Sequence, residues 1–340
     1  MSKCLVAPLN WGLGHASRCV PLIQRLLNEG HEVILGGDGE SLTLLRHHFP
    51  KLRYTYLAPL NLHYGSGKRQ VWAILKALPQ LLIWSIKDHT ILQSILREEP
   101  IDQVISDNRF GLFLTAKRSN SPKDGLTAKR SNSETVYITH QLHIMLPNGW
   151  KWAEGIASRL HARIYRRYNK VWVPDYAEPE KSLAGELSHN GTDVEYIGPL
   201  SRFENLRNIP NFPNNPNYDI VAVLSGLEPQ RTLLEKEIIA RYAGTDKRVL
   251  IVQGLMHRPN TRIKRGAITI VPHMKDAELV PALLGAQHII ARSGYSTIMD
   301  LHALGLLKAN SQQPTAKVEL HPTPGQPEQE YLATLHNKMK

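Results

Sequence analysis

The chain has 340 residues, of which 42% are hydrophobic, and a formal net charge of +11. This length can bury two cores, and the usual domain size predicts two domains. No stretch approaches the roughly 20 apolar residues of a membrane span. The first apolar run is too short and too interrupted for a secretory signal, and two cysteines, Cys4 and Cys19, are too few for a disulfide framework or a metal set. We therefore expect a cytoplasmic protein without a metal or other cofactor.

The first half of the chain alternates apolar runs with helical patterns. We expect strands at residues 4–9, 32–35, 54–57, 103–106, 136–139, 171–173 and 195–197. This alternation is typical of a parallel, doubly wound sheet with helices on both faces. We place the first domain at residues 1–200.

A glycine-rich turn follows the first expected strand. Gly12 and Gly14 allow a sharp turn and a close approach to a ligand, and His15 falls near the start of a helix expected at 16–28. A histidine there can act as a general base. The third glycine of the dinucleotide fingerprint is missing, and no acidic residue ends the second strand as that fingerprint requires, although Asp38 comes close. A dehydrogenase is therefore the poorer fit.

Residues 70–86 form an apolar segment with basic residues around it, among them Lys68, Arg69, Lys76 and Lys87. Such a segment can lie on an anionic bilayer, or it can be a helix packed on its own sheet with one basic edge. The positive charge also raises nucleic acid as a partner. No helix-turn-helix, zinc or aromatic RNA-binding signature is present, so we expect none.

One sequence, Leu-Thr-Ala-Lys-Arg-Ser-Asn-Ser, occurs at residues 114–121 and again at 126–133. Removing either copy leaves an ordinary connection between the strands on either side. We interpret residues 114–133 as a tandem duplication in a basic surface loop.

The second half begins after residues 201–217, which are rich in Asn and Pro and are typical of a linker. A second domain is expected at 218–340, with strands at 219–224, 249–253, 268–272, 288–291 and, more weakly, 317–320. Residues 307–317 form a polar insertion before the last strand. The domain is also expected to be short at its C-terminus, since the chain ends soon after the helix that begins at Pro327.

The strand at 288–291 leads through Arg292, Ser293 and Gly294 into a helix with Ser296 and Thr297 in its first turn. Free backbone N–H groups and the positive end of the helix dipole make this junction an anion site suited to a diphosphate. One turn further on, Asp300 is placed to accept hydrogen bonds from a ribose.

Four motifs in this order resemble those of the GT-B glycosyltransferases. They are Gly12-x-Gly14-His15, Ser225-Gly226 at the start of the second half, Arg292-Ser293-Gly294, and Pro324-Gly325-Gln326-x-x-Gln329. The closest likeness is to the MurG-like branch of UDP-N-acetylglucosamine transferases. The resemblance implies two Rossmann-like domains with parallel sheets flanking a deep interdomain cleft. It also implies an inverting, metal-independent transfer of a sugar, N-acetylglucosamine in that branch, from a UDP-sugar to a lipid-linked or cell-envelope acceptor.

The resemblance also implies roles for particular residues. His15 would be the general base and Asp107 would orient it, although Asp107 can equally cap the next helix. The leaving diphosphate would be bound by Ser225, Gly226, Ser293, Gly294, Ser296 and Thr297, with Arg231 and Arg292 as candidate cations. Gln326, Glu328 and Gln329 resemble residues that bind the donor sugar, and His273 lies where the family contacts the nucleotide base. Candidate acceptor contacts are Gly12, Gly14, Asn108, Arg109, His140 and Gln141.

Two other functions stay open. The same fold supports sugar-nucleotide epimerases, but these need additional acid and base carboxylates, and Asp107 is the one clear candidate. The other is a non-catalytic relative that binds a nucleotide and a membrane surface, which the duplicated loop, the polar insertion and the short C-terminus favour. A lipid-linked acceptor and the positive charge together predict peripheral association with the inner face of an anionic membrane.

Overall fold

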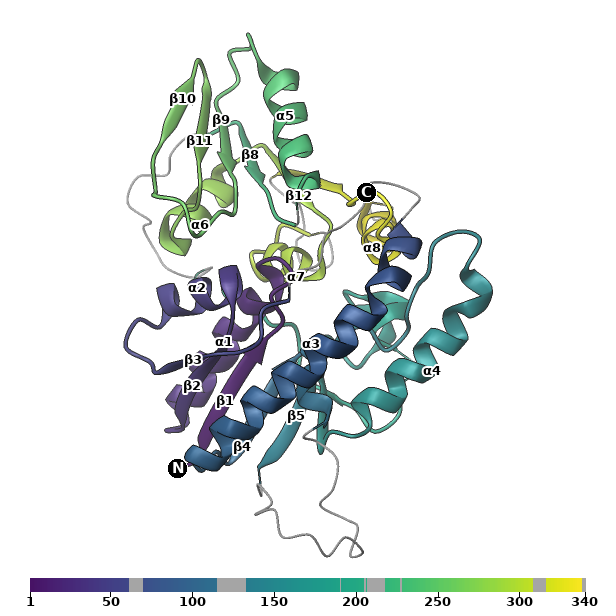
Figure 1. Cartoon of the computed structure of the whole chain (residues 1–340). Coiled ribbons are helices and arrows are strands. Elements are labelled where there is room, and N and C mark those ends of the chain that lie inside the picture. Colours follow the sequence, from purple (N-terminus) through teal and green to yellow (C-terminus); the bar gives the residue numbers. More distant parts are fainter. Residues whose placement is uncertain are drawn as a thin grey trace, which may run out of the picture. The chain divides into compact units, whose positions relative to one another are not determined.

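The computed structural model describes residues 1–60, 70–114, 133–189, 191–204, 206, 218–226, 228–307 and 316–337, and their side chains except those of 70–78, 113 and 114. The chain forms two compact α/β units (Figure 1). Within the described ranges, the first unit comprises Met1–Asn10, Cys19–His63 and Val71–Pro199. The second comprises Leu200–Lys340 together with the short segment Trp11–Arg18. Most of the expected duplicated loop, linker and polar insertion lies outside the described residues.

The first unit is built on a seven-stranded parallel sheet in the order β3-β2-β1-β4-β5-β6-β7. The strands are β1 (Lys3–Pro8), β2 (Glu32–Gly37), β3 (Tyr54–Tyr56), β4 (Gln103–Asp107), β5 (Glu134–Ile138), β6 (Lys170–Val173) and β7 (Glu195–Tyr196). In the central strand, Cys4 and Val6 are as buried as Leu5 and Ala7. Because successive side chains point to opposite faces, both faces of the sheet are covered, as a parallel sheet requires.

The helices of this unit are α1 (Gly14–Asn28), α2 (Gly39–His48), α3 (Gln70–Glu98) and α4 (Glu154–Tyr165). Short 3-10 turns occur at Phe110–Leu114, Lys151–Ala153, Pro179–Lys181 and Gly185–Leu187. Leu92 of α3 and Tyr165 of α4 belong to one core with Leu5 and Val104 of the sheet. Helices α3 and α4 therefore pack on the same face of the sheet.

The second unit has a six-stranded sheet in the order β10-β11-β9-β8-β12-β13, in which only the pair β10–β11 is antiparallel among the pairs described. Its strands are β8 (Ile220–Val223), β9 (Val249–Val252), β10 (Ile263–Arg265), β11 (Ile268–Val271), β12 (His288–Arg292) and β13 (Lys317–His321). Its helices are α5 (Gln230–Tyr242), α6 (Asp276–Gly285), α7 (Tyr295–Ala303) and α8 (Pro327–Asn337). Leu234 and Ile238 of α5 pack on Ile220, Ile251 and Ile290 of the sheet.

The expected α/β class is confirmed, and every expected strand is present within a few residues. Strand β10 was not expected, because its Ile-Lys-Arg sequence has no alternation and all three residues are exposed. Exposed basic residues are a common protection for an edge strand. Another difference concerns the expected linker, since Ser201 and Phe203 at its start are buried in the second unit.

The segment expected as either a packed or a bilayer-bound helix is the first part of α3. From residue 79 onward, Trp84 and Leu92 are buried, so the helix does pack on its own sheet. On its other side Leu82, Ile83 and Ile86 are at least half exposed. None of the helices in the described part of the chain is both long enough and apolar enough to cross a bilayer.

We expect Ile290→Ala to lower the free energy of unfolding of the second unit by about 2–5 kcal/mol, because Ile290 is fully buried in a central strand and its removal leaves a cavity. The measurement is hydrogen exchange of the β12 amides. Ile263→Ala, at a position 49% exposed on β10, serves as the control and should change stability by less than about 0.5 kcal/mol. Equal losses in the two variants would contradict this assignment of the core.

Candidate functional site

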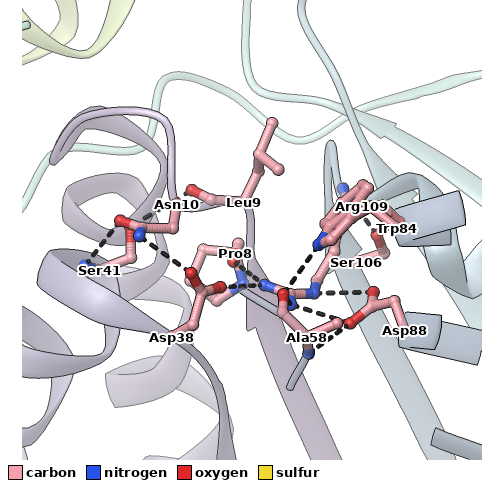
Figure 2. A network of polar contacts seen from close by, with 10 residues as sticks. All are labelled: Pro8, Leu9, Asn10, Asp38, Ser41, Ala58, Trp84, Asp88, Ser106 and Arg109. Carbon is pink, nitrogen blue, oxygen red and sulfur yellow. Dashed lines mark hydrogen bonds and ion pairs between the residues drawn. The ribbon is translucent and has the colours of Figure 1, made fainter. Parts of the chain in front are cut away.

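A buried ion network centred on Arg109 lies at the carboxyl ends of β3, β2, β1 and β4 (Figure 2). The Arg109 Nε and Nη2 atoms donate to the two carboxylate oxygens of Asp88, at 2.9 and 2.8 Å. Nη1 donates to Asp38 Oδ1 at 2.8 Å and, at 3.4 Å, to the carbonyl of Pro8. Nη2 also donates to the carbonyl of Ala58 at 2.6 Å. These contacts use all five N–H groups of the guanidinium.

Arg109 was expected to contact the acceptor, and this prediction is wrong. Its side chain is fully buried and no N–H group remains for a substrate. Burial lowers the pKa of Arg109, but the charges and hydrogen bonds of Asp88 and Asp38 outweigh this effect and hold it above the ordinary value. Arg109 is therefore a permanently charged part of the scaffold.

The glycine turn enters α1 at Gly14, after Gly12 with a φ of +76°. His15 lies in the first helical turn, and Arg18 Nη2 is 3.0 Å from its Nδ1 atom. Arginine has donors but no acceptor, so Nδ1 must accept this hydrogen bond, and the proton of the neutral ring is then on Nε2. Arg18 was not among the residues expected from the sequence, although its three-residue spacing from His15 places both side chains on one side of a helix.

Asp107 is the last residue of β4 and is fully buried, with the Cys19 thiol 3.7 Å from its Oδ2 atom. The hydroxyl of the preceding Ser106 accepts a hydrogen bond from the backbone N–H of Arg109 at 3.2 Å, just before the 3-10 turn Phe110–Leu114. The neighbouring Asn108 has a left-handed φ of +53°.

Asn108 is held by a chain of hydrogen bonds from the next strand. The Tyr137 hydroxyl donates to Asn108 Oδ1 at 2.8 Å and lies 3.2 Å from Nε2 of His161. Burial lowers the pKa of His161 to about 4, so the ring is neutral. The expected acceptor residues His140 and Gln141 follow the same strand; His140 is buried and Gln141 is half-buried.

In the second unit, the residues expected to bind the diphosphate lie after the neighbouring strands β8 and β12. Parallel strands bring their carboxyl ends to one edge of the sheet, where ligands bind. Ser225 and Gly226 follow β8, with a φ of +94° at Gly226. Gly294 precedes α7, and Ser293 donates from Oγ to the carbonyl of Gln329 at 2.7 Å.

Four more of the expected residues can be placed within this unit. Ser296 Oγ donates to the carbonyl of Gly14 at 2.8 Å, in the segment Trp11–Arg18 that clusters with this unit. Thr297 and Glu328 are half-buried in the first turns of α7 and α8. The ring of His273 lies 3.2 Å from the carbonyl of Arg258.

The expected donor-sugar residues Gln326 and Gln329 lie together at the start of α8. Gln329 Nε2 donates to Gln326 Oε1 at 2.6 Å, and its Oε1 accepts from the backbone N–H of Thr323 at 2.9 Å. The two amides are thus oriented by each other and by the turn after β13.

The two candidate phosphate cations have different surroundings. Arg231 is buried between Glu228 and Glu235, so its charge is already balanced and the prediction that it binds a phosphate is not supported. Arg292 donates to the carbonyls of Pro322 and Gln230, and its Nε atom has no hydrogen-bond partner among the described residues. Burial lowers the pKa of Arg292. A phosphate beside Arg292 would therefore stabilise an otherwise costly buried charge.

Asp300, expected to bind a ribose, is engaged within its own unit. Its Oδ1 atom accepts from Ser201 Oγ at 2.7 Å, and its Oδ2 atom lies 3.7 Å from Nε of Arg202, which also pairs with Asp276 at 3.2 Å. Burial raises the pKa of Asp300 to about 6, despite the nearby arginine. A ribose would have to share this carboxylate with Ser201.

Metal ligands do not gather anywhere in the described part of the chain in groups of three or more His, Cys, Asp or Glu residues.

No family model matches the chain. In sequence it is 24% identical over 321 residues to an uncharacterized glycosyltransferase of Methanosarcina acetivorans, covering 89% of this chain and 78% of the relative. A second uncharacterized glycosyltransferase, from Methanosarcina mazei, is 22% identical over 327 residues, with coverage of 89% and 77%.

Solved structures show the same fold. Spinosyn rhamnosyltransferase SpnG, in complex with thymidine diphosphate, has a TM-score of 0.57 and 15% identity, with coverage of 98% of this chain and 84% of the other. Arabidopsis thaliana UGT89C1, in complex with UDP-L-rhamnose, has a TM-score of 0.52 and 13% identity, with coverage of 99% and 90%. Together, the relatives and the fold confirm the resemblance to GT-B glycosyltransferases and the expected class of enzyme, a glycosyltransferase.

The raised pKa of Asp300 predicts a pH-dependent stability. Between about pH 4 and pH 6 the folded protein retains a proton on Asp300 that the unfolded chain releases, so the contribution of Asp300 to the free energy of unfolding falls as pH rises through this range and is level above it. Asp300→Asn removes this titration. We therefore expect the free energy of unfolding of Asp300→Asn, minus that of wild type, to rise by up to about 3 kcal/mol between pH 4 and pH 7.

Urea unfolding at several pH values measures this difference. Asp246→Asn, at an exposed aspartate of the same unit, is the matched control and should leave the pH dependence unchanged. A constant difference between Asp300→Asn and wild type would rule out the raised pKa.

Proposed function

We propose that this glycosyltransferase moves a sugar from a UDP-sugar, specifically N-acetylglucosamine, to a hydroxyl of a lipid-linked or cell-envelope acceptor, with inversion and without a metal. The observation that supports nucleotide binding in this proposal is the junction between β12 and α7. Arg292, the last residue of β12, is buried and its Nε atom has no hydrogen-bond partner among the described residues, and Gly294 two residues later precedes the N-terminus of α7. Backbone N–H groups, the helix dipole and a guanidinium together suit a diphosphate.

In this reaction the acceptor oxygen forms a bond to the anomeric carbon while the bond from that carbon to the diphosphate breaks. The electron pair leaves with the diphosphate, so the enzyme must stabilise negative charge there. Arg292 and the first turn of α7 would do so, and the paired amides of Gln326 and Gln329 would bind the sugar hydroxyls and the N-acetyl group. The thymidine diphosphate and UDP-L-rhamnose bound to the structural neighbours support a nucleoside diphosphate donor. Uridine and N-acetylglucosamine remain part of our proposal.

His15 is the proposed base that takes the proton of the acceptor hydroxyl, with Asp107 as its orienting residue. A base needs an unprotonated and accessible ring nitrogen. With Arg18 on Nδ1, the proton of the neutral ring lies on Nε2, which makes that nitrogen a donor. For His15 to act as the base, Arg18 must therefore move away from Nδ1 when substrates bind. If Arg18 stays in place, His15 can instead donate a hydrogen bond to the leaving phosphate.

We expect His15→Ala to lower kcat by about 10² to 10⁴-fold while UDP affinity stays within about threefold of wild type, because a base acts only on the acceptor. Calorimetric titration with UDP, UDP-N-acetylglucosamine, ADP and NAD, without added metal, measures binding. A labelled sugar nucleotide measures turnover. His15→Gln is the matched variant, since its amide can donate a hydrogen bond but cannot act as a base.

Unchanged turnover in His15→Ala would exclude His15 as the base. If turnover is lost in His15→Ala but near normal in His15→Gln, the role of His15 as a hydrogen-bond donor is favoured. Uridine-nucleotide binding without transfer would support a non-catalytic relative. Conversion of the UDP-sugar without an acceptor would support an epimerase. Absence of binding to all four nucleotides would overturn the proposed function.

A membrane-facing surface is the second part of the proposal, and α4 carries it. Its buried side includes His161 and Tyr165, whereas Ile156 and Leu160 on the other side are 51% and 59% exposed. Trp152, one turn earlier, is 73% exposed, and the exposed Arg159 lies on the same side of the helix. Apolar side chains beside arginines suit the headgroup region of an anionic bilayer. Helix α3, which packs on the same sheet face, carries further exposed apolar residues, Leu82, Ile83 and Ile86.

We expect the protein to sediment with phosphatidylglycerol vesicles and to be released by salt, because both apolar burial and charge contribute to binding. Replacing both Ile156 and Leu160 by Glu should abolish sedimentation. Leu233→Glu, at a leucine 52% exposed on α5 of the other unit, is the control and should bind as wild type does. Equal binding of all three proteins would exclude this surface.

A further inference from the structure

Asn10 is the last residue before the glycine turn that leads to His15, and it is fixed by the ion network of Arg109 (Figure 2). Its Nδ2 atom donates to Asp38 Oδ2 at 3.0 Å, while Arg109 holds the other oxygen of the same carboxylate at 2.8 Å. Its Oδ1 atom accepts from the backbone N–H of Ser41 at 3.3 Å. One side chain thus joins the end of β1 to the start of α2.

The surrounding backbone leaves Asn10 little freedom. At Gly39, with a φ of +52°, an added Cβ would lie 2.3 Å from Asn10 Nδ2, so a glycine is needed for the amide to fit. On the preceding residue, the Leu9 N–H donates to the carbonyl of Asp107 at 2.9 Å and the Leu9 carbonyl accepts from Ser41 Oγ at 3.3 Å. The chain therefore enters the turn from a fixed position and direction.

The charges of the Arg109 network hold Asn10 in this position. Arg109 is shared by two buried carboxylates, Asp38 and Asp88, so the three groups carry a net charge of −1. A carboxylate with too few donors in the interior is costly. The Asn10 amide supplies a further N–H to Asp38, so moving Asn10 would remove a donor from a buried anion. The turn and the network stabilise each other.

We propose that Arg109 is a positioning residue of the transfer reaction, which acts through Asp38 and Asn10 to fix the start of the turn that carries His15. Arg109 itself touches no substrate. The inference rests on the proposed function for its kinetic consequence, because a displacement of about 1 Å at a reacting group can cost about 10²-fold in rate.

Asn10→Ala tests the proposal without removing a charge, and Arg109→Lys tests the centre of the network. The matched control is Ser182→Ala in the same unit. Ser182 also donates to a buried carboxylate, that of Asp175 at 2.6 Å, and accepts from a backbone N–H, that of Gly185 at 2.7 Å. Both alanine variants thus lose a hydrogen bond to a buried carboxylate and one from a backbone N–H, and Ser182→Ala also loses the contact with Ser188 Oγ at 3.2 Å. We expect Asn10→Ala to lower kcat by about 10- to 100-fold with KM for the UDP-sugar changed less than about threefold, and Ser182→Ala to leave kcat within twofold.

A second readout does not depend on activity. In full-length protein labelled with ¹⁵N at histidine, the His15 ring signals, assigned with His15→Gln, should shift in Asn10→Ala and stay in place in Ser182→Ala. A wild-type protein without transferase activity would overturn the proposed function, and the ring signals would still decide the positioning role. Unchanged His15 signals in Asn10→Ala, with kcat equal to that of the Ser182→Ala control, would overturn this inference. If Arg109→Lys fails to fold, the Asn10→Ala result stands alone.

Discussion

The buried guanidinium of Arg109 between two carboxylates is the constraint on which the first unit depends. Transfer of three charged groups into the interior costs several kcal/mol per ion, which is recovered only where the hydrogen bonding is complete. Here all five N–H groups of Arg109 are used. The five acceptors come from the ends of β1, β2 and β3 and from α3. The network can therefore form only when these elements are in register, and it ties the carboxyl edge of the sheet into one piece.

Charges in the second unit are arranged differently. Glu319 on β13 is matched by Arg241 and His321, which outweigh the effect of burial and lower the pKa of Glu319 to about 2. Asp300, in contrast, has a pKa raised to about 6, and Arg292 donates only to carbonyls in its described hydrogen bonds. Perturbed groups of this kind gather where a ligand will complete the electrostatics. The contrast separates a carboxylate that holds the sheet together from two residues that, in the proposed function, contact the nucleotide.

Most of the fold could be predicted from the sequence because buried parallel strands leave a strong local signal. Runs such as residues 220–223 and 249–252 are apolar throughout and are bounded by turns. Strand β10 has no such signal in its own sequence, because it forms only by pairing with β11. The backbone turns at Gly12 and before α7 at Gly294 were also predictable, because a strand that leads through glycine into a helix has a local sequence pattern; their role in binding stays a prediction.

Side-chain pairing was the part that sequence alone could not provide. Arg109 at a strand end has the same appearance in sequence whether it binds a substrate or a distant carboxylate, and its partners Asp88 and Asp38 are 21 and 71 residues away. A signal existed at Asp88, a charged residue one helical turn after the buried Trp84 on the face that packs on the sheet. A buried acid on such a face requires a cation. Arg231 is a different case, because its partners Glu228 and Glu235 lie about one helical turn away on either side, where the sequence does carry a signal.

The pairing of His15 with Arg18 bears directly on how a proton could move. A carboxylate on Nδ1 would accept a hydrogen bond and leave Nε2 free as a base, whereas a guanidinium on Nδ1 donates one and leaves the proton on Nε2. The identity of the partner therefore decides whether the outer nitrogen accepts or donates. Because Arg18 is 2% exposed, its guanidinium is held inside the fold beside the ring. In the proposed reaction, His15 can therefore act as a base only after Arg18 has left Nδ1.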